Sequence, residues 1–240
     1  SDEFHLLHDP SRGPTLEVLL SRIRHRRPDA QIIALSATVG NAPEMAKWLD
    51  AELVVSDWRP VSLRYGTVNG LEGKIHRVDG EDNEVLPEVR HLEGKSTRQL
   101  QAVLSDTISR GGQLLVFVSS RSSAQKEARE LSKHCRKLLA DKTHGLVAEA
   151  SERWEEVANS ISRVEGSNLG KTLSSALRGG VAFHHAGLTG RQRGIIEDAF
   201  RGGELSCIVA TPTLAQGVNL PARTVVVRDY RRWSAAAGMS

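Results

Sequence analysis

The apolar positions of the first 57 residues follow two alternating periods. Leu16, Leu19, Leu20 and Ile23 follow the i, i+3, i+4, i+7 spacing of one helical face, and Pro14 suits the first position of a helix. The pattern predicts, in order, a helix over residues 15–27, a buried strand over 31–35, a helix from 41 through 49 and a short strand over 53–56. Helices that alternate with buried strands are typical of a parallel α/β sheet.

The pattern changes at Trp58-Arg59-Pro60, where the proline ends regular structure and marks a boundary. Residues 61–78 alternate in the manner of an antiparallel strand pair, and Asn69-Gly70 is the candidate turn between the two strands. Residues 79–95 are polar and acidic, and we expect them to form a loop.

Helical and strand periods alternate again from Ser96. The predicted elements are a helix over 97–109, a strand over 114–118, a helix over 121–139, one or two helices between 149 and 178, a strand over 181–184, a helix over 189–201, and strands over 205–210 and 224–227. This half of the chain is therefore also predicted to be α/β.

Composition narrows the setting of the protein. No apolar stretch approaches the roughly 20 residues needed to span a bilayer, so no membrane partner is expected. The two cysteines, Cys135 and Cys207, share no motif, which indicates a reducing, cytoplasmic setting and argues against a cysteine zinc site. The net charge of +3 is too small to decide for or against nucleic acid as a partner.

An acidic pair opens the chain, in the sequence Asp2-Glu3-Phe4-His5. Beside the phosphates of a nucleotide, one carboxylate of such a pair holds Mg²⁺ and the other activates the attacking water. Ser36-Ala37-Thr38 follows about thirty residues later, at the end of a predicted strand. Its small hydroxylated side chains can hydrogen-bond to the acidic motif, although Ser-Ala-Thr alone is also a common helix-capping turn.

These two segments resemble motifs II and III of superfamily 2 helicases of the DExH-box type. Leu115–Arg121 and Phe183–Leu188 fit the next motifs of the second motor domain, and Ala210–Ala222 looks like motif V of the superkiller-like branch. Val55–Val61 and Phe200–Gly203 are also similar to archaeal DNA-repair helicases of the Hjm type, relatives of the helicase half of polymerase theta. The resemblance covers nearly the whole chain.

The resemblance implies a RecA-like fold, with parallel sheets and flanking helices, and a role for each matched residue. Asp2 would hold Mg²⁺ and Glu3 would activate water for ATP hydrolysis. His5 would couple hydrolysis to Ser36, Ala37 and Thr38. Gly217 and Asn219 would line a nucleotide cleft. The nucleic-acid-binding surface would consist of Ser119, Arg121, Thr211, Thr213, Tyr230 and Trp233. Tyr230 and Trp233 suit stacking on a base and packing at a domain edge equally well.

Two other segments invite a site and are better explained by structure. Gly166 to Thr172 resembles a phosphate loop but has three residues between its glycines where that loop has four, so Asn168 is expected to cap a helix instead. His184 and His185 are adjacent on a predicted strand and would point to opposite faces, which disfavours a shared metal ion.

The chain also departs from the family pattern. It contains no Gly-x-x-x-x-Gly-Lys-Thr loop, and it ends before the arginine-bearing motif VI. The resemblance therefore assigns residues 1–57 to the C-terminal part of motor domain 1, residues 58–62 to a linker, and residues 63–240 to motor domain 2, truncated before motif VI. We expect the parent protein to hydrolyse ATP and the isolated chain to be inactive.

The function that the resemblance implies is that of an ATP-dependent helicase. It would move 3′ to 5′ on single-stranded DNA and unwind forked duplexes in repair and recombination, with ATP and Mg²⁺ as cofactors. Two alternatives stay open. One is an RNA helicase of the same branch, because contacts to phosphates barely distinguish DNA from RNA. The other is a non-catalytic, truncated nucleic-acid-binding module.

Overall fold

The structure is a computed structural model that describes residues 2–36, 40–56, 58, 61–78, 88–92, 98–140, 145–164, 167–214, 220–229, 233–234 and 238–239. Contacts within the chain divide it into two compact units, Ser1–Ser62 and Leu63–Ser240. Each unit is described by itself. No helix in the described residues combines the length and apolar character needed to cross a membrane.

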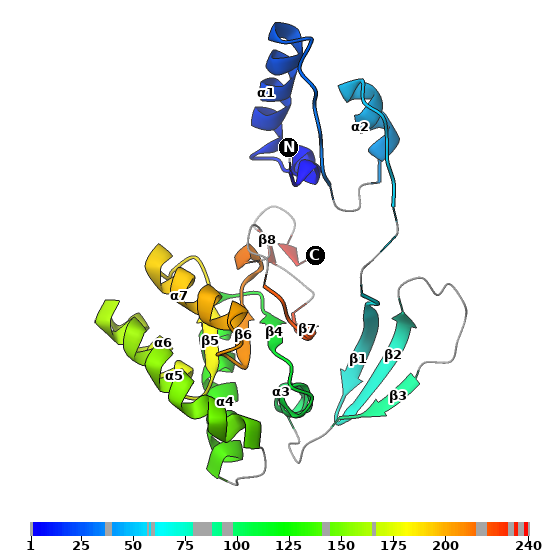
Figure 1. The fold of residues 1–240 in the computed structure, drawn as a ribbon. Helices are drawn as coiled ribbons and strands as arrows, with labels where there is room; N and C mark the ends of the chain where they lie inside the picture. Colours follow the sequence, from blue (N-terminus) through cyan, green and yellow to red (C-terminus); the bar gives the residue numbers. More distant parts are fainter. Residues whose placement is uncertain are drawn as a thin grey trace. The chain divides into compact units, whose positions relative to one another are not determined.

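The first unit is built from three helical segments (Figure 1). A 3-10 helix, η1 (Phe4–His8), precedes α1 (Gly13–Arg26), and α2 (Ala42–Leu49) follows. Both predicted α-helices are thereby confirmed. Phe4, Leu20, Met45 and Leu49 bury their side chains together and form the core of this unit.

The two strands predicted in this unit, residues 31–35 and 53–56, are not formed, so those predictions were wrong. Ile33 is 61% exposed and Val54 is 83% exposed, whereas a strand of a parallel sheet is buried on both faces. A strand is assigned only where a neighbour completes its ladder of backbone hydrogen bonds. Residues 2–36 and 40–56 form no such ladder.

The second unit begins with an antiparallel sheet of β1 (Arg64–Asn69), β2 (Glu72–Val78) and β3 (Glu88–His91). The predicted turn is confirmed, with Gly70 at a φ of +62°. The strand β3 lies where a loop over 79–95 was expected, so that prediction was wrong for Glu88–His91. These residues form a strand because they pair with β2. Arg90 also forms an ion pair with the buried Asp106 of α3 (Gln99–Ser109).

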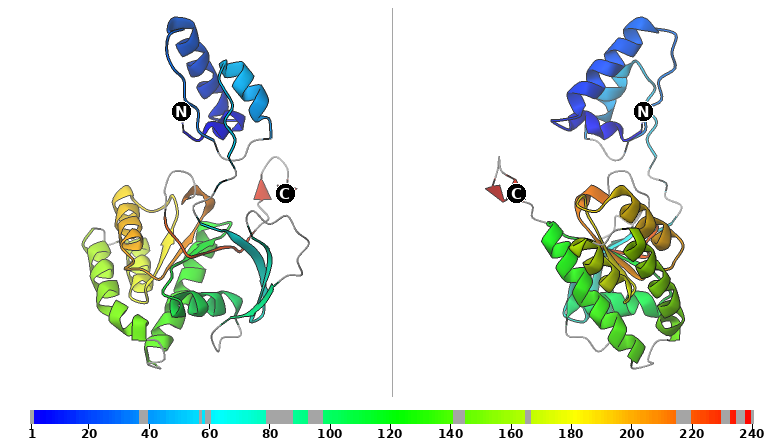
Figure 2. Two further views of the ribbon diagram at one scale, coloured as in Figure 1. Left: turned by 45° about the vertical axis from the view of Figure 1, so that its right-hand side comes forward. Right: turned by 90° about the vertical axis from the view of Figure 1, so that its left-hand side faces the viewer.

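A four-stranded parallel sheet forms the centre of the second unit (Figure 2). Its strands are β4 (Leu114–Phe117), β5 (Val181–His184), β6 (Cys207–Ala210) and β7 (Thr224–Val227), in the order β5-β6-β4-β7. All three strand pairs are parallel. The helices that follow α3 are α4 (Arg121–Ala140), α5 (Gly145–Val164), α6 (Asn168–Leu177) and α7 (Gly190–Arg201). The predicted RecA-like α/β class is confirmed.

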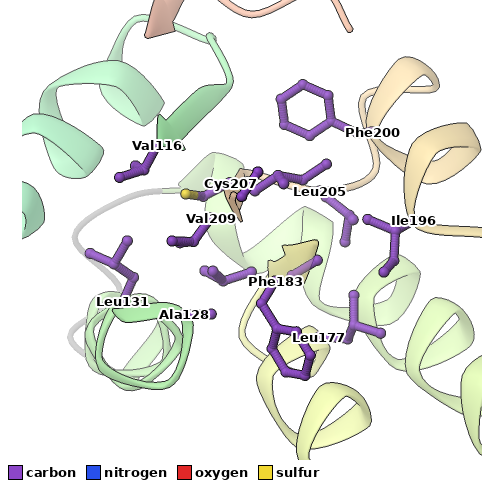
Figure 3. Packing of buried hydrophobic residues seen from close by; sticks show 14 of the residues in the cluster. Val116, Ala128, Leu131, Leu177, Phe183, Ile196, Phe200, Leu205, Cys207 and Val209 are labelled. Carbon is purple, nitrogen blue, oxygen red and sulfur yellow. The ribbon is translucent and has the colours of Figure 1, made fainter. Parts of the chain in front are cut away.

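Side chains from the helices and from β4, β5 and β6 fill the core (Figure 3). Phe183 of β5 and Val209 of β6 are fully buried, and Leu131 of α4, Leu177 of α6 and Phe200 of α7 surround them. Every residue of β5 and β6 is buried, as expected for strands covered on both faces. On β7, the edge strand opposite β5, partly buried residues alternate with exposed ones, so one face of β7 is left uncovered.

A short antiparallel pair, β8 (Trp233–Ser234) and β9 (Gly238–Met239), follows β7 along the chain. Two antiparallel strands joined by a short segment are the arrangement of a β-hairpin. The side chain of Trp233 lies outside the described part of the structure.

The glycine between α6 and β5 gives a test of the packing. Gly180 has a φ of +68°, and a Cβ added there would lie 2.3 Å from the ring of the buried Trp154. We expect Gly180→Ala to lower the free energy of unfolding by about 2–4 kcal/mol, because the methyl group strains left-handed backbone and displaces the indole. Urea denaturation of the chain, followed by circular dichroism, measures this loss.

Gly203→Ala is the matched control for that experiment. Gly203 has a φ of +75°, but a Cβ added there meets nothing within 4 Å. Only the backbone cost of about 1 kcal/mol is expected. Equal losses for the two substitutions would refute the role given to the contact with Trp154.

Candidate nucleic-acid and nucleotide sites

The four parallel strands bring their carboxyl ends to one edge of the sheet. Three backbone hydrogen bonds extend the ladder beyond the strands: Val118 N–H donates to Ala210 O at 2.9 Å, Thr211 N–H to His184 O at 3.1 Å, and Arg228 N–H to Phe117 O at 3.0 Å. The residues just after the strands are therefore held side by side. We call this row the carboxyl edge; in open α/β sheets it is where ligands bind.

Two helices begin at the carboxyl edge, and both N-termini are capped. The Ser120 hydroxyl accepts a hydrogen bond from Ser123 N–H at 3.1 Å in the first turn of α4. Thr189 and Gln192 form a capping box at the start of α7. The positive ends of both helix dipoles thus lie at this edge, an arrangement that favours anions.

Ser119 is joined to Asp229 across this edge. Its N–H and its hydroxyl both donate to Asp229 Oδ2, at 2.9 and 3.0 Å. Arg228 in turn donates to Asp229 and forms an ion pair of 2.7 Å with Glu127 of α4. Burial acts to raise the pKa of Asp229, but the hydrogen bonds from Arg228 and Ser119 outweigh burial and hold that pKa below the ordinary aspartate value.

Asp229 was not predicted as a site residue. One signal pointed to it: Asp229 follows the apolar run of β7, and polar residues at the carboxyl end of a parallel strand face the ligand edge. Its partner Ser119 lies 110 residues away, so the pairing itself has no local signature.

The two adjacent histidines have separate partners, in agreement with their predicted opposite directions. His184 Nε2 lies 2.8 Å from Glu197 Oε1, whereas His185 stacks on Phe183 and contacts Gln125 at 3.2 Å. Burial lowers the pKa of His184 despite the opposing bond to Glu197, and burial with the nearby Arg121 charge lowers the pKa of His185. Both rings therefore favour the neutral form.

The structure places two further predicted residues at the carboxyl edge. Arg121 is exposed at the first residue of α4, close to Gly187, and Thr211 is buried directly after β6. Thr213 belongs to a 3-10 helix, η2 (Pro212–Leu214), but its side chain is outside the described residues. The described residues also exclude Gly217, Asn219 and Tyr230.

In the first unit, the structure brings the acidic motif beside the residues that lead into Ser36. Phe4 N–H donates to Leu35 O at 2.9 Å, whereas Ala37 and Thr38 are outside the described residues. Glu3 has a φ of +54°, an unusual backbone conformation that is often found at functional sites. His5 Nε2 lies 3.3 Å from Glu3 Oε2.

The donor set of the acidic motif fits Mg²⁺. Asp2 and Glu3 are exposed, and Asp2 Oδ1 accepts a hydrogen bond from Glu3 N–H at 2.8 Å. Among the described residues, no three His, Cys, Asp or Glu side chains gather as a metal cage. Mg²⁺ in nucleotide sites is held by one or two carboxylates plus phosphates and water, so a single aspartate is sufficient protein ligation.

The segment that resembles a phosphate loop begins a helix. The Ser167 hydroxyl accepts a hydrogen bond from Gly170 N–H at 3.1 Å, and α6 starts at the next residue, Asn168. The predicted cap at Asn168 was therefore wrong by one position, because Ser167 has the extended backbone that a cap requires. The rejection of a phosphate loop here is consistent with the helix α5, not a strand, that precedes it.

Comparison with known proteins gives two results. Residues 156–237 match the family described as Helicase conserved C-terminal domain. The whole chain is also similar to proteins named ATP-dependent DNA helicase Hel308: 40% identical over 99% of this chain in Methanocella arvoryzae, 42% over 99% in Pyrobaculum calidifontis and 41% over 97% in Thermoplasma acidophilum. The chain spans 30%, 31% and 30% of the length of these relatives.

Asp229→Asn tests the network at the carboxyl edge. It removes the charge that accepts from Ser119 and Arg228, so we expect a loss of about 1.5–3 kcal/mol in the free energy of unfolding at pH 7. The control is Asp198→Asn, whose side chain is 79% exposed and pairs with Arg201 on the surface; a change within about 0.5 kcal/mol is expected. Equal changes in urea denaturation would contradict the network.

The same pair of variants has an expected pH dependence. Because the folded-state pKa of Asp229 is depressed, its contribution is present above the ordinary value of 3.8 and is lost as pH falls through the folded-state pKa. The difference in the free energy of unfolding between the unsubstituted chain and Asp229→Asn should stay constant from pH 7 down to the unfolded-state pKa of aspartate. It should become smaller only below that pH. A difference that narrows already near pH 6 would assign the effect to another group.

Proposed function

We propose that this chain, which is homologous to a segment of the Hel308 DNA helicases, is part of an ATP-dependent 3′–5′ DNA helicase. The predicted resemblance to superfamily 2 helicases is confirmed by that homology. In the proposed function, the parent protein couples ATP hydrolysis to movement along single-stranded DNA and unwinds forked duplexes in repair and recombination. The polarity and the forked substrate come from the resemblance.

The carboxyl edge of the parallel sheet is the observation that carries this proposal. It combines two capped helix N-termini with Ser119, Arg121 and Thr211. Backbone N–H groups, hydroxyls and a guanidinium suit the phosphates of a strand, which fix position without reading sequence. A motor that moves along DNA requires such sequence-independent contacts. We include Thr213, Tyr230 and Trp233 in the same surface by resemblance.

The nucleotide side of the proposal rests on the acidic motif. Asp2 would hold Mg²⁺, which neutralises charge on the phosphates of ATP, and Glu3 would accept a proton from the attacking water. His5 would transmit the state of this site to Ser36, Ala37 and Thr38, and the hydrogen bond from Phe4 to Leu35 supports that route. Gly217 and Asn219 would line the nucleotide cleft.

The domain assignment is part of the same proposal. Residues 1–57 would be the C-terminal part of motor domain 1, residues 58–62 the linker, and residues 63–240 motor domain 2. The division of contacts after Ser62 supports a boundary at this place. The two free, buried cysteines, Cys135 and Cys207, support a reducing, cytoplasmic setting.

An RNA helicase is the second candidate, since the carboxyl edge offers only phosphate contacts and a 2′-hydroxyl is the chemical difference between the two strands. The printed names of the relatives favour DNA. A non-catalytic binding module is the third candidate, because the chain itself has no Gly-x-x-x-x-Gly-Lys-Thr loop.

The steady-state ATPase rate of the parent protein tests these candidates. We expect single-stranded DNA to stimulate the rate and matched RNA to stimulate it far less. Glu3→Gln should lower the stimulated rate by about 10²-fold or more, because it removes the base that activates water. Glu44→Gln, an exposed carboxylate on α2, is the control and should leave the rate unchanged.

Other outcomes would reassign the function. Equal or greater stimulation by RNA would favour the RNA helicase, and no ATPase activity in the parent would favour the binding module. The isolated chain should show no turnover. If the isolated chain hydrolyses ATP and Glu3→Gln abolishes that activity, the chain does not need a phosphate loop and an arginine motif from the rest of the parent protein. This part of the proposal would then be wrong.

A further inference from the structure

A cavity of about 260 Å³ lies between α4 and α6 in the second unit. The two helices pack side by side (Figure 1). The cavity is lined by Arg129, Ser132, Arg136, Lys171, Thr172, Ser175 and Ala176. None of these residues belongs to the carboxyl edge, and none has a role in the proposed function.

The wall of this cavity is positive and carries no opposing charge. Arg129 and Arg136 on α4 and Lys171 on α6 are exposed, and no carboxylate is among the lining residues. Within the part of the chain that the structure describes, none of these three cations forms an ion pair. Three unpaired cations around one hollow attract an anion, because binding it relieves their mutual repulsion.

The cavity also lies on a continuous polar face of α4. Counted at about 100° per residue, Arg121, Gln125, Arg129 and Arg136 fall within about 80° of one another around the helix. The face runs about 22 Å, from Arg121 at the carboxyl edge to Arg136 at the cavity. Beside it lie Lys171 and the hydroxylated residues Thr172 and Ser175 of α6.

We propose that the cavity between α4 and α6 binds a backbone phosphate of the nucleic-acid strand that Arg121 contacts. The proposal rests on the proposed function. The continuity of the polar face favours a strand over a free anion, because a polyanion engages both ends of that face at once. Cations and hydroxyls with no base-reading side chain suit a phosphate of any sequence. The second motor domain would thus hold its strand at two separated positions.

The test is the salt dependence of binding between the full 240-residue chain and a fluorescein-labelled oligothymidylate. One double variant, Arg129→Gln with Arg136→Gln, removes two charges from the cavity. The matched control, Lys126→Gln with Lys137→Gln, removes two exposed charges at about 140° and 160° around α4 from Arg121, outside the polar face. Each single-strand phosphate contact contributes about 0.7 to the slope of log affinity against log salt.

We expect the cavity variant to flatten that slope by about 0.7, the contribution of one phosphate contact, with no change of slope in the control. Equal slopes for the two double variants would overturn the proposal. In that case Arg121→Gln would still weaken binding, and the proposed function would stand. If the chain binds no strand and Arg121→Gln changes nothing, the proposed function fails and the second phosphate position fails with it.

A second experiment, with inorganic phosphate as the probe, distinguishes a nucleic-acid strand from a free anion as the ligand of the cavity. One outcome is that phosphate raises the melting temperature of the unsubstituted 240-residue chain but not that of the cavity variant, with equal strand-binding slopes for the two double variants. In that case the site serves a free phosphate-bearing ligand and the proposal is wrong. If the slope differs as expected and phosphate competes with the oligothymidylate, the proposal is supported.

Discussion

The arrangement of the second unit depends on the parallel hydrogen-bond ladder that joins β5, β6, β4 and β7. The ladder continues past the strands through Val118, Thr211 and Arg228, each of which donates to a neighbouring strand end. This extension fixes the spacing of residues that are far apart in sequence. It also fixes where α4 and α7 begin, so the helix dipoles and the polar side chains meet at one edge. Without parallel strands, no such edge exists.

The charges of Asp229, Arg228 and Glu127 are paired with one another before any ligand binds. Both donors of Ser119 point to Asp229, and Arg228 joins that carboxylate to Glu127. Under the proposed function, a phosphate at Ser119 takes the place of Asp229 as the acceptor. Arg228 then remains as a partner for the released carboxylate, so the exchange leaves no buried charge unpaired. The network that stabilises the free chain therefore competes with a strand for the two donors of Ser119.

Local pattern was sufficient wherever an element's own side chains decide its structure. The apolar run of β6 and the helical face of α4 were predicted from sequence because burial on both faces, or on one stripe, appears in the order of residues. The strand β3 was missed because Glu88–His91 is polar and becomes a strand by pairing with β2 and through the Arg90–Asp106 ion pair. The same holds for the candidate site. Arg121 was predicted from a motif, whereas the hydrogen bond from Ser119 to Asp229 could not be predicted because it depends on the register of two strands.

In the first unit, the local pattern predicted strands that the structure does not contain. Residues 31–35 and 53–56 have the apolar composition of strands, yet Leu35 and Val55 are 59% and 72% exposed. Among the described residues of this unit, the core has four buried apolar side chains. A parallel strand needs a hydrogen-bonded neighbour and cover on both faces, and residues 2–36 and 40–56 provide neither for these segments. Their apolar composition alone therefore does not make them strands, and Phe4 N–H still donates to Leu35 O in the absence of a strand there.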